Sequence, residues 1–295
     1  MKATLNKEES IIIGGGPAGM ISAIQLKRYG ITAPLFEANR LGGLLWNANL
    51  VENYPGFPGG IPGPKLVERF AQQFESHSLE GIYQRVLEVD YDPNGFIVAT
   101  DGNTYISRTL VVATGTRPKT FPVGFIPDAG LEKVFYEVAP LLDVRDKTIA
   151  VIGAGDAAFD YAINLSRKNR VVILNRTQQI KALPLLVQRC AKIQNIEYIQ
   201  GVTVSSVLVE ANKLLLITTS QHKNMFHADF LIGAIGREEN PPLMSNRMRE
   251  EAPNLVKSGR LHVVGDVQNG IYRQTAIAVG DGLKAAMKIY QFLKE

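Results

Sequence analysis

Cysteine is almost absent from this sequence: Cys190 is the single thiol among 295 residues. One thiol can form neither an intrachain disulfide nor the CxxC pair of a dithiol redox site. This excludes a fold held by disulfides, and it excludes electron transfer through two cysteines of the same chain. Cys190 lies in a segment with a helical pattern, where a buried structural thiol is favoured over a redox role.

Long apolar runs and long runs of one charge are also lacking. No apolar stretch approaches the roughly 20 residues of a membrane span, and Met1–Ser10 is too polar and short for a signal peptide. We therefore expect a cytoplasmic protein that does not contact membranes. The net charge of +4 mildly favours acidic partners. No basic stretch with interleaved aromatic residues indicates nucleic acid, and no metal site is expected.

The length and composition are those of an ordinary globular protein. The chain is long enough for about two domains with cores of their own. Its residues are 45% hydrophobic and 20% charged, as is typical of soluble proteins.

A glycine-rich turn follows the first apolar segment. Ser10–Ile13 predicts a strand that enters the turn, and Met20–Tyr29 predicts the helix that leaves it. Gly14 allows the tight turn, Gly16 lets the backbone approach a pyrophosphate, and Gly19 lets the helix pack on the strand. The positive end of the helix attracts phosphate. The pattern predicts a dinucleotide site, with a chance glycine-rich turn as the alternative for the motif alone.

An acidic residue stands where such a site needs one. The predicted strand Ile31–Phe36 leads into Glu37, about 18 residues after the last glycine of the turn. A carboxylate at this position accepts hydrogen bonds from the hydroxyls of an adenosine ribose. The alternative, a solvated charge at a strand end, is less consistent with this register.

The same succession of elements occurs again about 140 residues later. Lys147–Ile152 predicts a strand, Gly153–Ala158 is a GxGxxA turn, Phe159–Ser166 predicts a helix and Arg170–Leu174 the next strand. Two such units predict two Rossmann-like modules.

The second unit lacks the acidic residue. Its strand is followed by Asn175, Arg176 and Thr177, with Lys181 further on. Cations without a carboxylate suit a 2′-phosphate, so NADPH is preferred over NADH. A plain surface role for Arg176 is the alternative.

The remaining pattern adds strands, helices and one acidic strand end. Helices are predicted at Leu66–Glu75, Pro184–Ile193 and Thr275–Leu293, and strands at Tyr83–Val89, Phe96–Thr100, Thr104–Ile106, Thr109–Ala113, Glu197–Gln200, Val204–Glu210, Lys213–Thr219, Phe230–Ala234 and Leu261–Asp266. Asp266, at the end of the last strand, could bind a ribitol chain or cap a helix.

Seven motifs in order carry a resemblance to a known family. They are Gly14–Gly19, Gly42–Gly43, Val51–Gly56, Ala113–Gly115, Gly153–Asp156, Ala234–Gly236, and Gly265–Val267 with Tyr272–Gln274. Over nearly its full length the chain resembles the low-molecular-weight thioredoxin reductases and their flavoprotein relatives. The resemblance implies an α/β fold of two Rossmann-like, three-layer ββα nucleotide-binding domains, and a homodimer. It implies an FAD domain at 1–117 and 240–295 around an NAD(P)H domain at 118–239.

The resemblance also assigns residues. Gly14–Gly19 would hold the FAD pyrophosphate, Glu37 the ribose, Asp266 the ribitol, and Arg273 with Gln274 the flavin edge. Backbone N–H groups at the helix start near Gln274 would stabilise negative charge on reduced flavin. The cofactor-binding residues expected from pattern and resemblance together are Gly14, Gly16, Pro17, Ala18, Gly19, Glu37, Gly42, Gly43, Asn53, Ala113, Gly115, Gly153, Gly155, Asp156, Ala157, Arg176, Lys181, Gly236, Gly265, Asp266, Arg273, Gln274 and Thr275.

The chain departs from the family at the redox centre. The family has a CxxC pair before its second glycine motif, where this chain has Phe135–Pro140 without sulfur. Neither Tyr136 nor Ala139 can supply the thiolate that attacks a disulfide. A conventional thioredoxin reductase is therefore excluded, and no protein residue is expected to be catalytic beside the flavin. Trp46, after the Gly42–Gly43 turn, could pack on the flavin or in the core.

Without a disulfide, reduced flavin must meet its electron acceptor directly. An acidic ferredoxin or flavodoxin is the first expectation, since flavin can divide a hydride into single electrons. Relatives that serve ferredoxin carry a C-terminal cover over the flavin, and this sequence ends at Glu295 soon after the last predicted helix. A small acceptor such as a quinone or oxygen is one alternative, and an FAD-binding protein without turnover is another.

Overall fold

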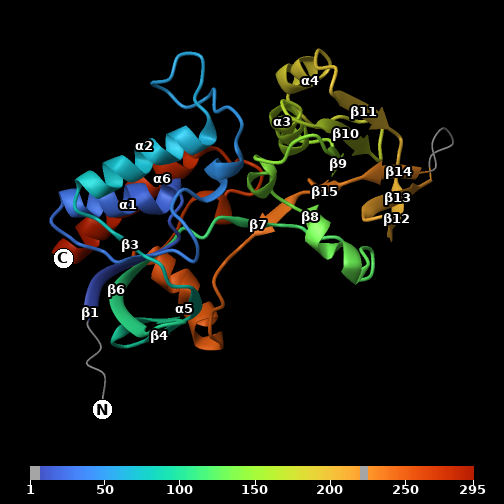
Figure 1. The fold of residues 1–295 in the computed structure, drawn as a ribbon. Coiled ribbons are helices and arrows are strands. Elements are labelled where there is room, and N and C mark those ends of the chain that lie inside the picture. Colours follow the sequence, from blue (N-terminus) through green and yellow to red (C-terminus); the bar gives the residue numbers. More distant parts are fainter. Residues whose placement is uncertain (1–6, 220–224) are drawn as a thin grey trace. The chain divides into compact units, whose positions relative to one another are not determined.

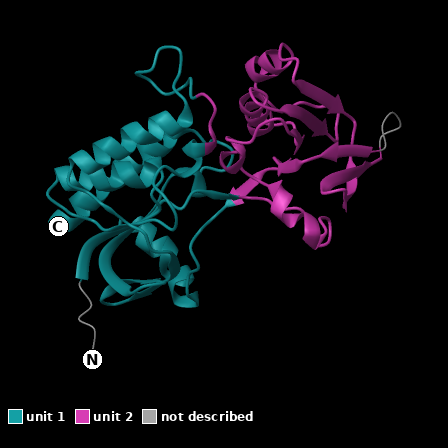
Figure 2. Ribbon diagram, viewed as in Figure 1, with its two compact units in different colours: residues 1–46, 51–117, 239–295 teal, residues 47–50, 118–238 magenta. Residues whose placement is uncertain are grey.

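The chain folds into two compact units. A computed structural model describes residues 7–219 and 225–295 (Figure 1). Unit 1 comprises Met1–Trp46, Val51–Arg117 and Glu239–Glu295, and unit 2 comprises Asn47–Leu50 and Pro118–Glu238 (Figure 2). Two ranges, 1–6 and 220–224, lie outside the described residues. Both belong to the expected domains, and the first is part of the polar N-terminal stretch. None of the described helices combines the length and apolar character that a bilayer span requires.

Unit 1 is built on a seven-stranded sheet in the order β3-β2-β1-β6-β5-β4, with β17 also paired to β6. The strands β1, β2, β3, β6 and β17 run parallel, whereas β4, β5 and β6 form an antiparallel meander. The strands are β1 (Lys7–Ile13), β2 (Leu35–Phe36), β3 (Gly81–Ile82), β4 (Val86–Asp92), β5 (Gly95–Thr100), β6 (Thr104–Val112) and β17 (Leu261–Val263).

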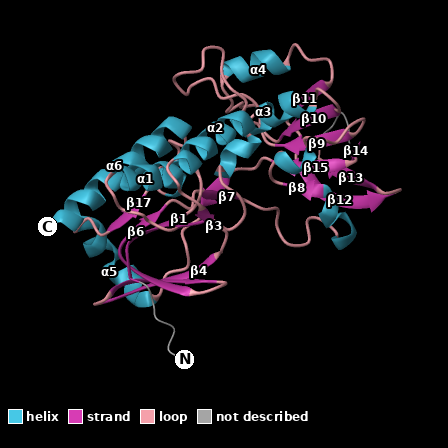
Figure 3. Cartoon of the chain, turned by 60° about the vertical axis from the view of Figure 1, so that its left-hand side comes forward, coloured by secondary structure: helices cyan, strands magenta, loops and turns pink. Residues whose placement is uncertain are grey.

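Two hydrophobic cores lie on the two faces of this sheet. Successive strand side chains point to opposite faces, so Ile12 and Val111 join one core while Ile11 and Val112 join the other. Helices α1, α2 and α6 cover the first face, and α5 packs near β4 and β17 on the second (Figures 1 and 3). The helices are α1 (Pro17–Arg28), α2 (Gly63–Ser76), α5 (Asn246–Lys257) and α6 (Thr275–Lys294).

Helices α1 and α6 approach closely because small residues meet between them. A Cβ atom added at Gly282 would lie 2.2 Å from the Ala18 carbonyl oxygen. The buried Ser22 hydroxyl lies 2.8 Å from the Ala18 carbonyl oxygen and 3.0 Å from that of Gly282. The C-terminal helix is thereby fixed against the helix that follows the first glycine turn.

Unit 2 repeats the three-layer arrangement. Its five-stranded sheet is parallel throughout, in the order β11-β10-β9-β15-β8, and an antiparallel sheet β12-β13-β14 lies separately. Helices α3 and α4 pack on one face (Figure 3), and residues of the smaller sheet on the other. The elements are β8 (Val134–Phe135), β9 (Thr148–Ile152), α3 (Asp156–Leu165), β10 (Arg170–Asn175), α4 (Pro184–Cys190), β11 (Ile196–Gln200), β12 (Val204–Glu210), β13 (Lys213–Thr218), β14 (Met225–Ala228) and β15 (Phe230–Gly233).

The chain passes between the units through two segments that pair with each other. These are β7 (Thr116–Pro118) and β16 (Arg237–Glu239), which form a two-stranded sheet. The expected α/β fold of two Rossmann-like modules is confirmed, with unit 1 discontinuous in sequence.

Several predicted elements need correction. The strand predicted at Ile31–Phe36 is only β2, because the Ile31 N–H bonds the Leu26 carbonyl at the end of α1 and Pro34 has no N–H to donate. The strands predicted at Thr104–Ile106 and Thr109–Ala113 are one strand, β6. The strand predicted at Tyr83–Val89 begins only at Val86, as β4, and β3 precedes it at Gly81–Ile82. The strand predicted at Leu261–Asp266 ends at Val263, as β17. The helix predicted at Pro184–Ile193 ends at Cys190, and helix α5 was not predicted.

A short segment before Val51 belongs to unit 2 by its contacts. The Asn49 N–H donates to Asp160 Oδ2 at 2.8 Å, and Arg167 donates to Asn49 Oδ1 at 2.8 Å. Burial raises the pKa of Asp160 to about 6, against the opposing hydrogen bonds from Asn49 and the charge of Arg167. The folded protein therefore binds the proton of Asp160 more tightly than the unfolded chain does.

This raised pKa predicts a pH-dependent stability. Between the ordinary value of 3.8 and about 6, the folded state holds more protons than the unfolded state, so the free energy of unfolding falls as pH rises through this window. Asp160→Asn keeps an acceptor for the Asn49 N–H but carries no titratable proton. We therefore expect this variant not to show the pH-dependent decrease of about 2 to 3 kcal/mol in the free energy of unfolding. Denaturant unfolding between about pH 4 and pH 7 measures this. The exposed Glu251→Gln is the control, and an unchanged slope in Asp160→Asn would contradict the assignment.

Candidate functional site

The first glycine turn places backbone where no side chain fits. Gly14 has φ +107°, and a Cβ atom there would lie 2.3 Å from the Ala113 carbonyl oxygen. A Cβ atom at Gly19 would lie 1.9 Å from the Gly14 carbonyl oxygen. At Gly16, by contrast, no atom lies within 4 Å of the Cβ position. The turn is thus closed against the neighbouring strand and open in front of Gly16, at the start of α1.

Glu37 is oriented toward this turn by backbone donors. The Gly15 N–H donates to Glu37 Oε2 at 2.8 Å, and the Asn39 N–H donates to Oε1 at 2.9 Å. A carboxylate oxygen accepts about two hydrogen bonds, so capacity remains on both oxygens for ribose hydroxyls. Gly15 and Asn39, which the sequence pattern did not single out, position the predicted ribose ligand.

The Gly42–Gly43 turn lies against the same loop. The Gly42 N–H donates to the Gly15 carbonyl at 2.8 Å, and a Cβ atom at Gly43 would lie 3.3 Å from Gly16 Cα. The Trp46 indole N–H donates to the Leu41 carbonyl at 2.7 Å, and the Arg40 guanidinium carbon lies 4.1 Å from the ring centroid. The Leu41 carbonyl and the Arg40 guanidinium therefore contact the polar edge and one face of the Trp46 ring.

Two predicted flavin residues from distant parts of unit 1 meet. Asn53 Nδ2 donates to Gln274 Oε1 at 2.8 Å. Gln274 is the N-cap of α6 and makes no capping bond with its side chain. The first N–H groups of α6, which begins at Thr275 beside Arg273, therefore have no capping side chain as a partner. A site that stabilises developing negative charge requires such N–H groups.

The Gly265–Asp266 turn also comes to the first helix. A Cβ atom at Gly265, which has φ +74°, would lie 3.1 Å from Ala18 Cβ. Asp281, which the sequence pattern did not indicate, accepts hydrogen bonds from the Gly265 N–H at 3.2 Å and from Asn269 Nδ2 at 2.6 Å. Asp266 does not cap α6, whose N-cap is Gln274. Its ribitol role stays a prediction.

The Ala113–Gly115 motif leaves a buried polar atom unsatisfied. The Thr114 hydroxyl has no hydrogen-bond partner among the described residues although it is buried. Thr114 directly follows the carbonyl that closes on Gly14, and Gly115 has φ +64°. A buried hydroxyl without a partner is costly unless a ligand or water satisfies it. Together with the open Gly16 and the oriented Glu37, this fits a bound dinucleotide.

Unit 2 repeats the geometry of the turn. Gly153 has φ +143°, and a Cβ atom there would lie 2.2 Å from the Ala234 carbonyl oxygen, whereas no atom lies within 4 Å of the Cβ position at Gly155. Asp156, exposed beside Ala157 in the first turn of α3, accepts the Leu183 N–H at 2.7 Å. In this turn, as in the first, there is no room for a side chain at the first glycine, whereas the space beside the second glycine is open.

The loop after β10 is organised by an amide. Asn175 is buried, and its Nδ2 donates to the Gln179 carbonyl and to the Tyr198 hydroxyl, both at 3.0 Å. The Lys181 N–H donates to the Ala154 carbonyl at 2.9 Å, which ties the loop to the glycine turn. Arg176 is exposed. The loop thus holds a buried amide at the position of the missing acid, with cations outside it.

The turn after β15 reaches the entry segment of unit 2. Gly236 has φ +113°, and its carbonyl accepts the Lys119 N–H at 3.0 Å.

Comparison with known proteins agrees with this geometry. The family model of the pyridine nucleotide-disulphide oxidoreductases matches residues 8–282. This chain belongs to that family. Thioredoxin reductase of Mycoplasma genitalium is 28% identical to it, covering 95% of this chain and 93% of the relative. Thioredoxin reductase of Chlamydia pneumoniae is 29% identical, covering 96% and 98%. Lactococcus lactis thioredoxin reductase has the same fold, with a TM-score of 0.83 at 24% identity over 97% of this chain and 99% of that one.

Family membership defines the enzyme class. The chain is an FAD-dependent pyridine nucleotide-disulphide oxidoreductase of the thioredoxin reductase-like type, and the family implies FAD and NAD(P)H as cofactors. The backbone closures and open glycines described above are consistent with two dinucleotides.

A polar cluster in this oxidoreductase surrounds the segment where the resemblance expects two cysteines. The Tyr136 hydroxyl accepts the Phe121 N–H at 2.9 Å. The Ala139 N–H donates to Asn47 Oδ1 at 3.0 Å, and Asn47 Nδ2 donates to Glu137 Oε2 at 3.2 Å. Glu137 also forms an ion pair with Arg237 at 3.1 Å.

The environment of the single thiol disfavours its reaction with disulfides. Cys190 is 4% exposed, and its nearest polar partner is the Phe159 carbonyl at 3.7 Å. Burial, with a smaller contribution from Asp160, raises the pKa of the Cys190 thiol to about 11. The thiolate needed for disulfide exchange is therefore disfavoured at neutral pH.

The two open glycines give a matched pair of variants. Gly16 and Gly155 both have extended backbone with negative φ, and no atom lies within 4 Å of the Cβ position at either, so a Cβ atom can be added at both without a clash. We expect Gly16→Val to weaken FAD retention by about tenfold or more, because the side chain enters the pyrophosphate space. Gly155→Val should retain FAD and lose reduction by NAD(P)H.

Flavin absorbance after gel filtration, and bleaching by NAD(P)H, measure the two effects. Full flavin content in Gly16→Val, or equal loss of flavin in both variants, would contradict the assignment of one dinucleotide to each unit.

Proposed function

We propose that this chain passes electrons from NAD(P)H through FAD directly to an external acceptor, a ferredoxin- or flavodoxin-type protein, without a redox-active disulfide. The observation that carries the proposal is the segment around Tyr136 and Ala139. A phenol and a methyl group stand where the resemblance expects two sulfurs, and the remaining thiol, Cys190, is buried with a raised pKa. A dithiol relay to thioredoxin needs a second thiol, and the sequence contains only Cys190.

The residues of unit 1 would bind and tune the cofactor. FAD, when bound, supplies the hydride acceptor that can release electrons singly. Gly14–Gly19 would hold its pyrophosphate, Glu37 its ribose and Asp266 its ribitol, and Asn53 with Gln274 would border the ring. The N-terminus of α6, where Gln274 makes no side-chain cap, would favour negative charge on the ring.

The domain roles and the assembly follow from the same proposal. Unit 1 would be the FAD-binding domain, unit 2 the NAD(P)H-binding domain, and the protein a homodimer, as the resemblance implies. The net charge of +4 would attract an acidic acceptor at a rate that decreases with salt. The named relatives are thioredoxin reductases, so thioredoxin is the acceptor against which the proposal is tested.

NADPH is the proposed donor, with Arg176 and Lys181 at its 2′-phosphate. The buried Asn175 supports this preference, because an amide stands where an NADH site carries an acid. We expect Arg176→Ala to slow flavin reduction by NADPH about tenfold and to leave NADH nearly unaffected. Stopped-flow bleaching with both nucleotides measures this, with Arg189→Ala on α4 as the control. Equal losses for both nucleotides would count against a 2′-phosphate contact.

The acceptor is identified by an NADPH-driven panel of thioredoxin, ferredoxin, flavodoxin, a quinone and oxygen. We expect turnover with ferredoxin or flavodoxin that decreases as salt rises, no thioredoxin reduction, and the same profile in Cys190→Ser. Thioredoxin reduction that Cys190→Ser abolishes would refute the proposal. Turnover only with the small acceptors would replace the protein acceptor, and a flavin that no nucleotide bleaches would indicate a non-catalytic FAD-binding protein.

A further inference from the structure

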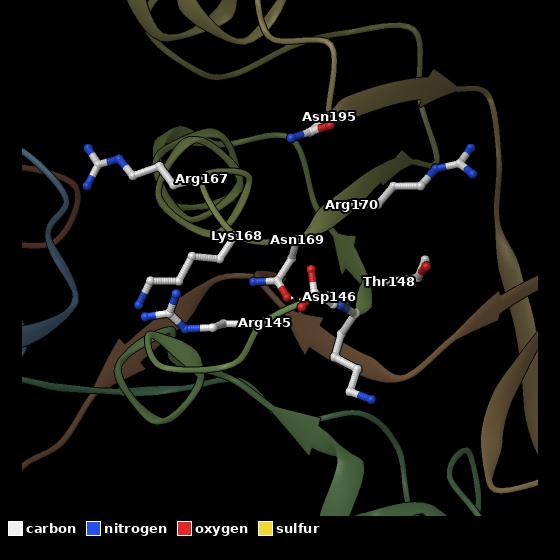
Figure 4. A pocket seen from close by; sticks show the side chains of 9 residues that line it. Arg145, Asp146, Thr148, Arg167, Lys168, Asn169, Arg170 and Asn195 are labelled. Carbon is white, nitrogen blue, oxygen red and sulfur yellow. Dashed lines mark hydrogen bonds between the residues drawn. The ribbon is translucent and has the colours of Figure 1, made fainter.

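A basic pocket opens at the edge of the unit 2 sheet away from its glycine turn. The pocket has a volume of about 550 Å³ and is lined by residues 145–148, which lead into β9, residues 167–170, which lead into β10, and Asn195 (Figure 4). The glycine turn at Gly153 follows the opposite end of β9. Five residues of strand separate the two by roughly 15 Å, so the pocket is not part of the expected dinucleotide site.

The pocket is formed by a hydrogen-bonded frame. Asn169, buried at 5% exposure, accepts the Lys147 N–H at 3.1 Å. Its Nδ2 donates to the carbonyls of Val144 at 2.9 Å and Leu165 at 3.1 Å. The Arg170 N–H donates to the Lys147 carbonyl at 2.9 Å. The two lining segments are therefore joined to each other, which fixes the backbone that carries the cations.

Positive charge dominates the lining. The charged side chains are Arg145, Lys147, Arg167, Lys168 and Arg170, against the single carboxylate of Asp146. Some of this charge is matched. Arg170 pairs with Glu197 at 2.9 Å, and Lys168 lies 3.5 Å from the fully exposed Asp143.

The remaining cations differ in their surroundings. Arg167 donates to the neutral side chains of Asn49 and Asn164, and its charge also acts on the Asp160 carboxyl. Arg145 and Lys147 have no side-chain hydrogen bond or ion pair with any of residues 7–219 and 225–295. In Figure 4 Arg145 and Lys168 extend from the two lining segments toward the same side of the pocket. Like charges gathered in this way repel one another unless an anion lies between them.

The local helix accounts for part of this charge but not for all of it. Arg167 and Lys168 follow the C-terminal end of α3, where the helix dipole favours cations. Arg145 and Lys147 lie in the loop before β9, which no helix end explains. The lining offers guanidinium, ammonium, hydroxyl and amide groups, and no aromatic or aliphatic side chain that could hold a base or a hydrocarbon tail.

We propose that this pocket binds a small multiply charged phosphate compound through Arg145 and Lys147. A guanidinium fork matches two oxygens of a phosphate, and an ammonium group serves as a second point charge. The proposal is independent of the acceptor and of the nucleotide preference proposed above.

The test uses calorimetric titration of tripolyphosphate into the dimer or monomer as purified, saturated with FAD and NADP⁺ so that both glycine turns are occupied. The variant is R145Q/K147Q, and the control is K257Q/K284Q, which removes the same charge from exposed positions on α5 and α6. We expect saturable binding that the pocket variant weakens about tenfold or more and that the control leaves unchanged. Circular dichroism and retained flavin check the fold of both variants.

Three results would overturn the proposal. Absence of saturable heat in the wild-type protein would show that the pocket has no such ligand. Equal weakening in both double variants would show that only the overall charge attracts the anion. Citrate binding as tightly as tripolyphosphate, with the same loss in R145Q/K147Q, would show a carboxylate-accepting surface rather than a phosphate site.

Discussion

Two backbone carbonyl oxygens determine the shape of the two glycine turns of this protein. The Ala113 carbonyl lies 2.3 Å from the Cβ position of Gly14, and the Ala234 carbonyl lies 2.2 Å from that of Gly153. Each carbonyl belongs to the residue directly after the strand beside the one that enters the turn, β6 beside β1 and β15 beside β9. A side chain at either glycine would separate the strands, and its φ would be strained as well. The two units therefore share one geometric constraint.

The rest of each site depends on that closure. Once the first glycine turns tightly against its neighbour, the next helix begins at the carboxyl edge of the sheet with its N–H groups toward the open side. The second glycine of each turn, Gly16 or Gly155, then faces empty space. In unit 1 the same loop receives the Gly42 N–H and the Glu37 carboxylate. A short motif thus positions groups that lie well apart in the sequence.

Local sequence patterns predicted these turns because the residues that determine their geometry are adjacent in the sequence. Elements that depend on distant partners were predicted less well. Helix α5 follows a proline pair and contains Pro253, so its sequence resembles a loop, and its face is defined by packing of Met248 and Leu255 on the unit 1 sheet. The hydrogen bond between Asn53 and Gln274 joins residues 221 positions apart. No periodicity or spacing could indicate it, although the family resemblance placed both residues near the flavin.

The polar cluster around Glu137 and the role of Asp281 were not predicted for the same reason. Asn47 reaches Glu137 across 90 positions of sequence, and Arg237 reaches it across another hundred. Asp281 lies on α6 and has no local signal that it will receive the Gly265 N–H. The basic pocket beside Asn169 was not predicted either, because it forms where the segments leading into β9 and β10 meet in space, and these segments lie apart in the sequence.

Strand β6 pairs with β5 and with β17 at different residues, and this has a consequence for synthesis on the ribosome. Its first residues pair with β5, and its last residues, Leu110–Val112, pair with Leu261–Val263 of β17. Unit 2 is completely translated at Glu238, before β17 emerges. Unit 2 can therefore finish folding while unit 1 waits with an unpaired strand edge and an incomplete core, a state that exposes apolar surface to aggregation. The order of emergence makes unit 1 the last to close.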